Sequence, residues 1–73
     1  MIFEKIAEII SDKLDVPKER ITRGSTFDDL DADSLYVVEI MMMIEEALDV
    51  NLDDLADVEN VGDIVEYVEA QLR

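Results

Sequence analysis

Apolar residues recur along most of this chain at the three- and four-residue spacing that is typical of amphipathic helices. The spacing predicts three main helices, over Ile2–Leu14, Ser34–Leu48 and Val61–Leu72, and one short helical turn over residues 53–57. It predicts no strand and no internal repeat. The expected fold is therefore all-α. We expect a single domain of residues 1–73, in which three main helices and a short helix, third in chain order, form an up-and-down bundle.

The connection over residues 15–33 is long for a bundle of this size. It begins with Asp15-Val16-Pro17, which ends the first helix because proline cannot continue it. Asn60 can cap the last helix. Four apolar residues are expected to hold the connection against the core, namely Val16, Ile21, Phe27 and Leu30.

The helix over Ser34–Leu48 is apolar on two sides. One side falls within an arc of about 100° and is expected to face the core; it comprises Val37, Ile40, Met41, Ile44 and Leu48. The other side carries Leu35, Val38 and Met42, which we call the apolar stripe. Glu45 lies on one margin of the stripe, and Glu39 and Glu46 lie on the other. Single apolar residues are common on surfaces, but a stripe bordered by acids favours a docking surface for other proteins.

The chain has a large excess of acidic residues over basic ones. It carries 20 acidic and 6 basic residues, a net charge of −14, and no Lys or Arg lies between Gly24 and Leu72. Nucleic acids and anionic membranes are bound by clustered basic residues, so the charge argues against both as ligands. It favours a protein partner with a basic patch.

The usual catalytic and targeting signals do not occur in the sequence. Without His or Cys the chain cannot form the common nucleophilic triads, a disulfide or a thiolate metal site. The longest apolar run, residues 40–44, is far too short to span a bilayer, and charged residues near the start break any signal peptide. We therefore expect a non-enzymatic, soluble, cytoplasmic and monomeric protein.

Three aspartates at every second position make a calcium-binding loop an alternative interpretation. Asp29, Asp31 and Asp33 match positions 1, 3 and 5 of such a loop, but Ser34 and Ile40 replace its glycine and its final glutamate. No dedicated metal site is therefore expected, and a calcium-binding acidic domain stays as an alternative.

Ser34 is the candidate for modification. Asp33 is a good N-cap, which places Ser34 on the first turn of its helix with its hydroxyl accessible. A phosphate ester on that hydroxyl would lie at the positive end of the helix dipole. A modifiable serine at a helix start, on a small acidic domain, indicates a carrier protein rather than a catalyst.

Several segments of the chain resemble the acyl carrier protein family. Asp33-Ser34-Leu35, preceded by Leu30 and followed by an acidic helix that contains methionines, is similar to the modification motif of that family. Residues 14–16, 27–30 and 61–68 resemble its first helix exit, its Phe-x-x-Asp-Leu segment and its last helix. The resemblance covers nearly the whole chain and is closest to the discrete, type II carriers.

The resemblance implies a mechanism. A carrier-protein synthase, which is a phosphopantetheinyl transferase, would use coenzyme A and Mg²⁺ to attach 4′-phosphopantetheine to Ser34, with Asp33 helping to position the modifying enzyme. The thiol of this arm would hold acyl groups as thioesters and deliver them to enzymes of fatty acid or related, polyketide-like biosynthesis. Fatty acyl, polyketide and aminoacyl carriers share this mechanism; the acidity and the Asp-Ser-Leu motif favour the first two.

The resemblance also implies two surfaces. Acyl-processing enzymes with basic docking patches would meet Leu35, Val38, Glu39, Met42, Glu45 and Glu46. The acyl chain would be sheltered by Val37, Ile40, Ile44, Leu55, Val61 and Ile64, each of which is equally a plain core residue. An acidic helical interaction module without a prosthetic group is the alternative, and it would use the same apolar stripe.

The sequence departs from the family pattern at a few positions. Asp15 and Asp31 stand where the family usually has glycine, and Tyr36 stands where it often has an acid. Residues 52–61 are about two residues short and lack the usual proline. These differences suggest a specialised carrier.

Overall fold

The computed structural model describes residues 2–52 and 58–72, and these residues form three α-helices and one turn of 3₁₀ helix. The helices are α1 (Ile2–Leu14), α2 (Ser34–Leu48) and α3 (Val61–Leu72), so the predicted boundaries of all three main helices are confirmed. The 3₁₀ turn, η1 (Lys18–Arg20), was not predicted; it follows Pro17, whose extended backbone starts it. The short helix expected over residues 53–57 lies outside the described residues.

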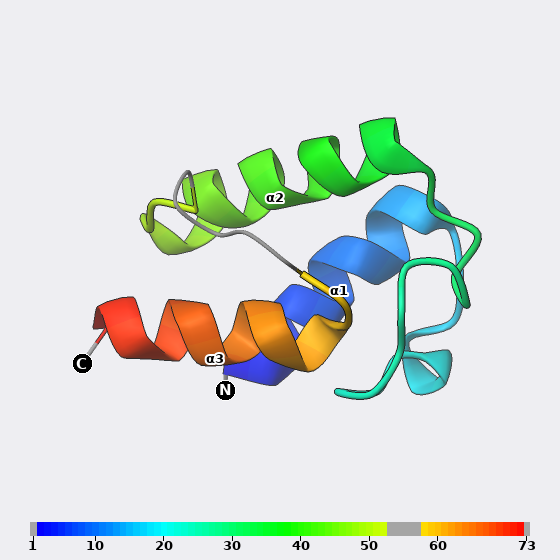
Figure 1. Cartoon of the computed structure of the whole chain (residues 1–73), viewed down its shortest axis with the longest axis horizontal. Helices are drawn as coiled ribbons and strands as arrows, with labels where there is room; N and C mark the ends of the chain where they lie inside the picture. The colour runs from blue at the N-terminus through cyan, green and yellow to red at the C-terminus, as the bar shows by residue number, and fades with distance from the viewer. Residues whose placement is uncertain (1, 53–57, 73) are drawn as a thin grey trace.

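The helices are arranged around α1. Both α2 and α3 pack against α1. Figure 1 shows α2 and α3 running in the same direction, with their amino-terminal ends toward the same side of the molecule. A shared direction is what an up-and-down order gives for the second and fourth of four helices, so it agrees with the expected bundle.

The core is made of apolar side chains, mostly aliphatic, from all three helices and from the long connection. Ile21, Phe27 and Leu30 are buried, and Val16 packs half-buried against them, so the predicted anchors of the connection are confirmed. The fully enclosed side chains are Ile6, Ile10, Ile40, Ile44, Val61, Ile64, Val65 and Val68. Burial of Ile21, Phe27 and Leu30 against these side chains holds the connection in place, and the connection in turn positions the start of α2.

The amino-terminal end of α3 closes onto the same connection. Asn60 Oδ1 accepts a hydrogen bond from the Asp63 N–H at 3.0 Å, which confirms Asn60 as the cap, and Asp63 Oδ2 accepts one from the Asn60 N–H at 3.3 Å. The carbonyl oxygen of Arg23 accepts the Gly62 N–H at 2.8 Å. A β-carbon at Gly62 would lie 3.0 Å from that same oxygen, so glycine is what permits this close approach.

Three aspartates adopt the left-handed backbone conformation that glycine adopts most readily. Asp15 has a φ of 56°, Asp31 of 57° and Asp49 of 55°. Asp49 forms the C-cap of α2. Asp15 and Asp31 stand at the two positions where the family that this chain resembles usually has glycine. The turns therefore keep a glycine-like backbone at some conformational cost.

Within the described residues, no helix has the length and apolar character needed to cross a lipid bilayer.

Candidate functional site

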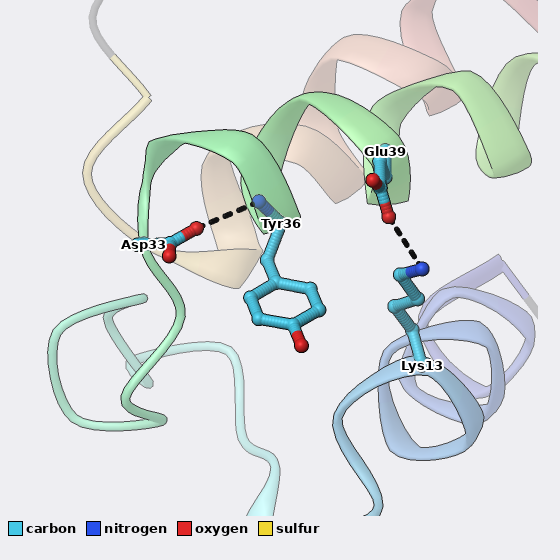
Figure 2. A network of polar contacts seen from close by, with 4 residues as sticks. All are labelled: Lys13, Asp33, Tyr36 and Glu39. Atoms are coloured by element: carbon cyan, nitrogen blue, oxygen red, sulfur yellow. Dashed lines mark hydrogen bonds and ion pairs between the residues drawn. The ribbon is translucent and has the colours of Figure 1, made fainter.

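Ser34 is the first residue of α2 and is exposed to solvent. The preceding residue, Asp33, has an extended backbone, with a φ of −81° and a ψ of 179°, as an N-cap should. Its Oδ1 accepts a hydrogen bond from the Tyr36 N–H at 3.0 Å, which Figure 2 shows. Its carbonyl oxygen accepts one from the Val37 N–H at 3.0 Å. The predicted cap is confirmed, and it fixes the direction in which the backbone enters the helix at Ser34.

The turn before Ser34 is held by local hydrogen bonds. The Asp29 N–H donates to Thr26 Oγ1 at 3.0 Å, and the Thr26 N–H donates to Asp29 Oδ2 at 3.4 Å. The Ala32 N–H donates to the carbonyl of Phe27 at 2.9 Å. The Asp29 carboxylate is thus used within the turn, and the described part of the chain has no group of three acids arranged to hold a metal ion. The geometry gives no support to the calcium alternative.

An open pocket of about 790 Å³ adjoins Ser34. It lies between the first two turns of α2, the end of the long connection and the residues before α3. Its lining residues are Thr26, Phe27, Asp28, Ala32, Asp33, Ser34, Val37, Val38, Met41, Val58 and Glu59. The pocket therefore joins an exposed hydroxyl to a largely apolar wall.

The residues expected to shelter an acyl chain lie in different places. Val37 lines the pocket. Ile40, Ile44, Val61 and Ile64 are completely enclosed in the core and form no part of the pocket wall. Leu55 lies outside the described residues.

Sequence reasoning did not assign Met41 and Val58 to the pocket. Met41 lies one turn after Val37 on the same side of α2, so the helical wheel could have shown it. Val58 reaches the pocket only through the tertiary fold, and no sequence pattern signals that contact.

The apolar stripe is on the surface, as its pattern predicted. Leu35 is 67% exposed, Val38 is 53% exposed and Met42 is 60% exposed. Because Val38 also lines the pocket, the stripe and the pocket are continuous. Solvent-exposed apolar side chains in one row beside Ser34 offer a surface that other proteins can cover.

The glutamates beside the stripe are not equivalent. Glu39 forms an ion pair with Lys13 of α1, and Glu45 Oε2 accepts a hydrogen bond from the Leu52 N–H at 2.8 Å. Glu46 is exposed. The sequence did not reveal the two internal partners, since both contacts depend on how segments far apart in the chain pack together.

The ammonium group of Lys13 has two neighbours on α2. It pairs with Glu39, and it lies 5.5 Å from the centroid of the Tyr36 ring. The hydrogen bond that Lys13 donates to Glu39 is the main cause that raises the pKa of Lys13 above its usual range. Desolvation opposes it, and the electrostatic interactions with Glu39 and the Tyr36 side chain add to it. Lys13 is therefore fully cationic at neutral pH.

The residues around Ser34 fit a phosphopantetheine group. The hydroxyl-bearing residue is exposed, and backbone N–H groups at a helix start favour the negative charge of a phosphodiester. The adjoining pocket gives room for an appended chain. An exposed serine at this position can therefore act as an attachment point.

Comparisons with known proteins agree with this arrangement. A family model described as "Phosphopantetheine attachment site" matches residues 4–68. The acyl carrier protein of Streptococcus pneumoniae is 44% identical over 72 residues, which is 99% of this chain and 97% of that protein. That of Streptococcus pyogenes is 46% identical with the same coverage. That of Clostridium perfringens is 49% identical over 70 residues and 92% of each chain.

Proposed function

This chain belongs to the acyl carrier protein family, and on that premise we propose that Ser34 is the residue to which its 4′-phosphopantetheine arm is attached. The chain is a non-catalytic carrier. When bound, the arm supplies a terminal thiol that holds an acyl group as a thioester. The observation that carries the proposal is the exposure of Ser34 on the first turn of α2, directly after the Asp33 cap and beside the open pocket.

The chain's own contribution to loading is to present the Ser34 hydroxyl. Asp33 caps the helix and so fixes the position of Ser34 relative to the first turn. The helix start stabilises a phosphodiester there by about 0.3–1 kcal/mol, because the dipole favours negative charge. The chain has no imidazole and no thiol to accept the hydroxyl proton, and in this proposal that base is assigned to the modifying transferase.

The docking surface in this proposal is the exposed side of α2. The apolar stripe supplies the area that a partner covers, and Glu46 supplies a charge that is accessible to a basic patch. Glu39 and Glu45 lie on the same surface but already have internal partners. Electrostatic contacts of this kind favour fast association and fast release, which suits a shuttle between enzymes.

The pocket beside Ser34 is the proposed shelter for the acyl chain. Its apolar wall includes Val37, Val38, Met41 and Val58. Burying each methylene of a chain against such a wall stabilises it by about 0.8 kcal/mol. The enclosed residues Ile40, Ile44, Val61 and Ile64 would join the wall only if the core opened toward the pocket.

In cellular terms, we place this carrier in the cytoplasm as a monomer. There it would be loaded by a phosphopantetheinyl transferase and would serve enzymes of fatty acid or polyketide-like biosynthesis. The strong negative charge supports the monomer, because like charges oppose self-association.

Intact-mass measurement tests the attachment residue. The protein is incubated with coenzyme A, Mg²⁺ and a promiscuous phosphopantetheinyl transferase. The wild type and Ser11→Ala should each gain one phosphopantetheine group, and Ser34→Ala should gain none. A gain on Ser34→Ala would overturn the proposal. So would an unmodified wild type beside an active control carrier.

A further inference from the structure

One cation reaches the side of α2 that carries the proposed docking surface. Lys13 extends from the last turn of α1 to Glu39, and its ammonium group also lies 5.5 Å from the centroid of the Tyr36 ring. Figure 2 shows all three side chains together, with Lys13 directed at Glu39. Tyr36 and Glu39 are three residues apart, so they lie on one side of the helix and a single ammonium group can contact both.

The contact places a basic residue against a helix that has none of its own. Apart from Arg73, every Lys and Arg lies within residues 1–23, and α2 contains none. In the part of the chain that the structure describes, Lys13–Glu39 is the only ion pair. Of all the described acids, the one neutralised in this way is a margin residue of the apolar stripe.

The side chains of the pair are partly exposed, so a partner protein can reach them. Lys13 is 29% exposed and Glu39 is 38% exposed. An ion pair at this exposure is weak and exchanges readily, because water screens it. Another cation can therefore replace Lys13 at Glu39.

We propose that Lys13 is a specificity-determining residue of the docking surface, which competes with basic side chains of the phosphopantetheinyl transferase for Glu39. The inference rests on the proposed function of Ser34. A transferase residue that pairs with Glu39 must displace the Lys13 ammonium group and must approach its like charge. A basic residue directed at Glu46 meets no such competitor. Lys13 thus favours partners whose positive charge lies toward the Glu46 end of α2.

Tyr36 gives the Lys13 ammonium group a second contact on the first turn of α2. Its ring attracts the Lys13 cation, and an aromatic ring at this position replaces the acid that is frequent in the family. The side of α2 nearest the attachment residue is therefore less negative than its sequence composition suggests.

The test compares charge-removing variants as substrates of the transferase. Lys13→Gln should raise kcat/KM for modification of Ser34 about two- to fivefold at low salt. This factor corresponds to the free energy of an exposed ion pair, which the transferase no longer has to break. The gain should appear in KM rather than in kcat, and it should shrink at high salt. Lys13→Arg, which keeps the pair, should behave like the wild type.

Lys5→Gln is the matched control. Lys5 is exposed on the same helix and carries the same charge, but it lies about 12 Å along the helix axis from Lys13 and takes no part in the Lys13–Glu39 pair. Its kcat/KM should change much less. In a Glu39→Gln background, Lys13→Gln should have no further effect.

Two outcomes would overturn the inference. In the first, Lys13→Gln and Lys5→Gln change kcat/KM equally, so that only the net charge of the protein matters. In the second, Lys13→Gln still raises kcat/KM in the Glu39→Gln background. A merely structural ion pair would change thermal unfolding without changing KM. If the wild type is not modified at all, the proposed function itself fails; if all variants are modified at equal rates, only the role of Lys13 fails.

Discussion

The carboxylate of Asp33 accepts the backbone N–H of Tyr36 at 3.0 Å, and this hydrogen bond spans the residue proposed to carry the prosthetic group. The cap satisfies an N–H group that the helix cannot satisfy itself. It also means that the first turn of α2, on which Ser34 lies, depends on the residue immediately before it. Stability of the helix start and presentation of the hydroxyl are thus coupled.

Removal of the cap should weaken the protein. We expect Asp33→Ala to lower the free energy of unfolding by about 1 kcal/mol, because the Tyr36 N–H loses its acceptor. Asp33→Asn keeps an acceptor oxygen and should lose much less. Urea denaturation of the two variants measures the difference. Equal stability of both with the wild type would contradict the role of the cap.

Replacement of a left-handed aspartate by glycine should stabilise the fold. At Asp31, where φ is 57°, glycine removes the steric cost of the conformation, and we expect a gain of roughly 0.5–1 kcal/mol. Asp31→Asn separates this effect from the loss of a negative charge. Asp28→Gly, in the same turn but without a positive φ, should not stabilise. Thermal and urea unfolding test the set, and a loss of stability in Asp31→Gly would contradict the argument.

Gly62 should be intolerant of a methyl group. Alanine normally favours a helix over glycine by about 1 kcal/mol. Here the added carbon would lie 3.0 Å from the Arg23 carbonyl oxygen, which is held by the Gly62 N–H itself. We expect Gly62→Ala to destabilise by about 1 kcal/mol, since overpacking outweighs propensity.

Gly24→Ala is the control for this prediction. The nearest atom to a β-carbon at Gly24 is Thr22 Oγ1 at 3.9 Å, which is ordinary contact. The Gly24→Ala variant should unfold at about the same urea concentration as the wild type. If Gly62→Ala proved as stable as Gly24→Ala, the close approach between α3 and the connection would not be tight.

The apolar stripe should matter for docking and not for folding. Leu35 is 67% exposed, so Leu35→Ala should leave the unfolding midpoint nearly unchanged while lowering kcat/KM for the transferase several-fold, through loss of covered apolar area. Leu72→Ala removes a similar exposed side chain from α3 and should leave kcat/KM unaltered. Equal effects of the two variants on modification would show that α2 is not the docking side.

The sequence predicted the helices well because periodicity and capping are local. The boundaries of α1, α2 and α3 follow from apolar spacing and from stop and start residues such as Pro17, Asp33 and Asn60. The burial of Phe27 and Leu30 was also predictable from the sequence, because apolar side chains in an otherwise polar connection are stabilised by packing into the core.

The remaining features depend on contacts between distant parts of the chain. Lys13 and Glu39 are 26 positions apart, and only the packing of α1 on α2 brings them together. The pocket beside Ser34 needs Val58, which is brought there by the path of the chain before α3. No local pattern encodes these relationships.

Localisation of the added group tests the central claim most directly. Because aspartates precede and follow α2, a protease that cuts before Asp yields a peptide of residues 33–48, in which Ser34 is the only serine and Tyr36 the only other hydroxyl. After reaction with coenzyme A and a transferase, tandem mass spectrometry of this peptide should place one phosphopantetheine group on Ser34. An added group on any other peptide, or on Tyr36, would contradict the account.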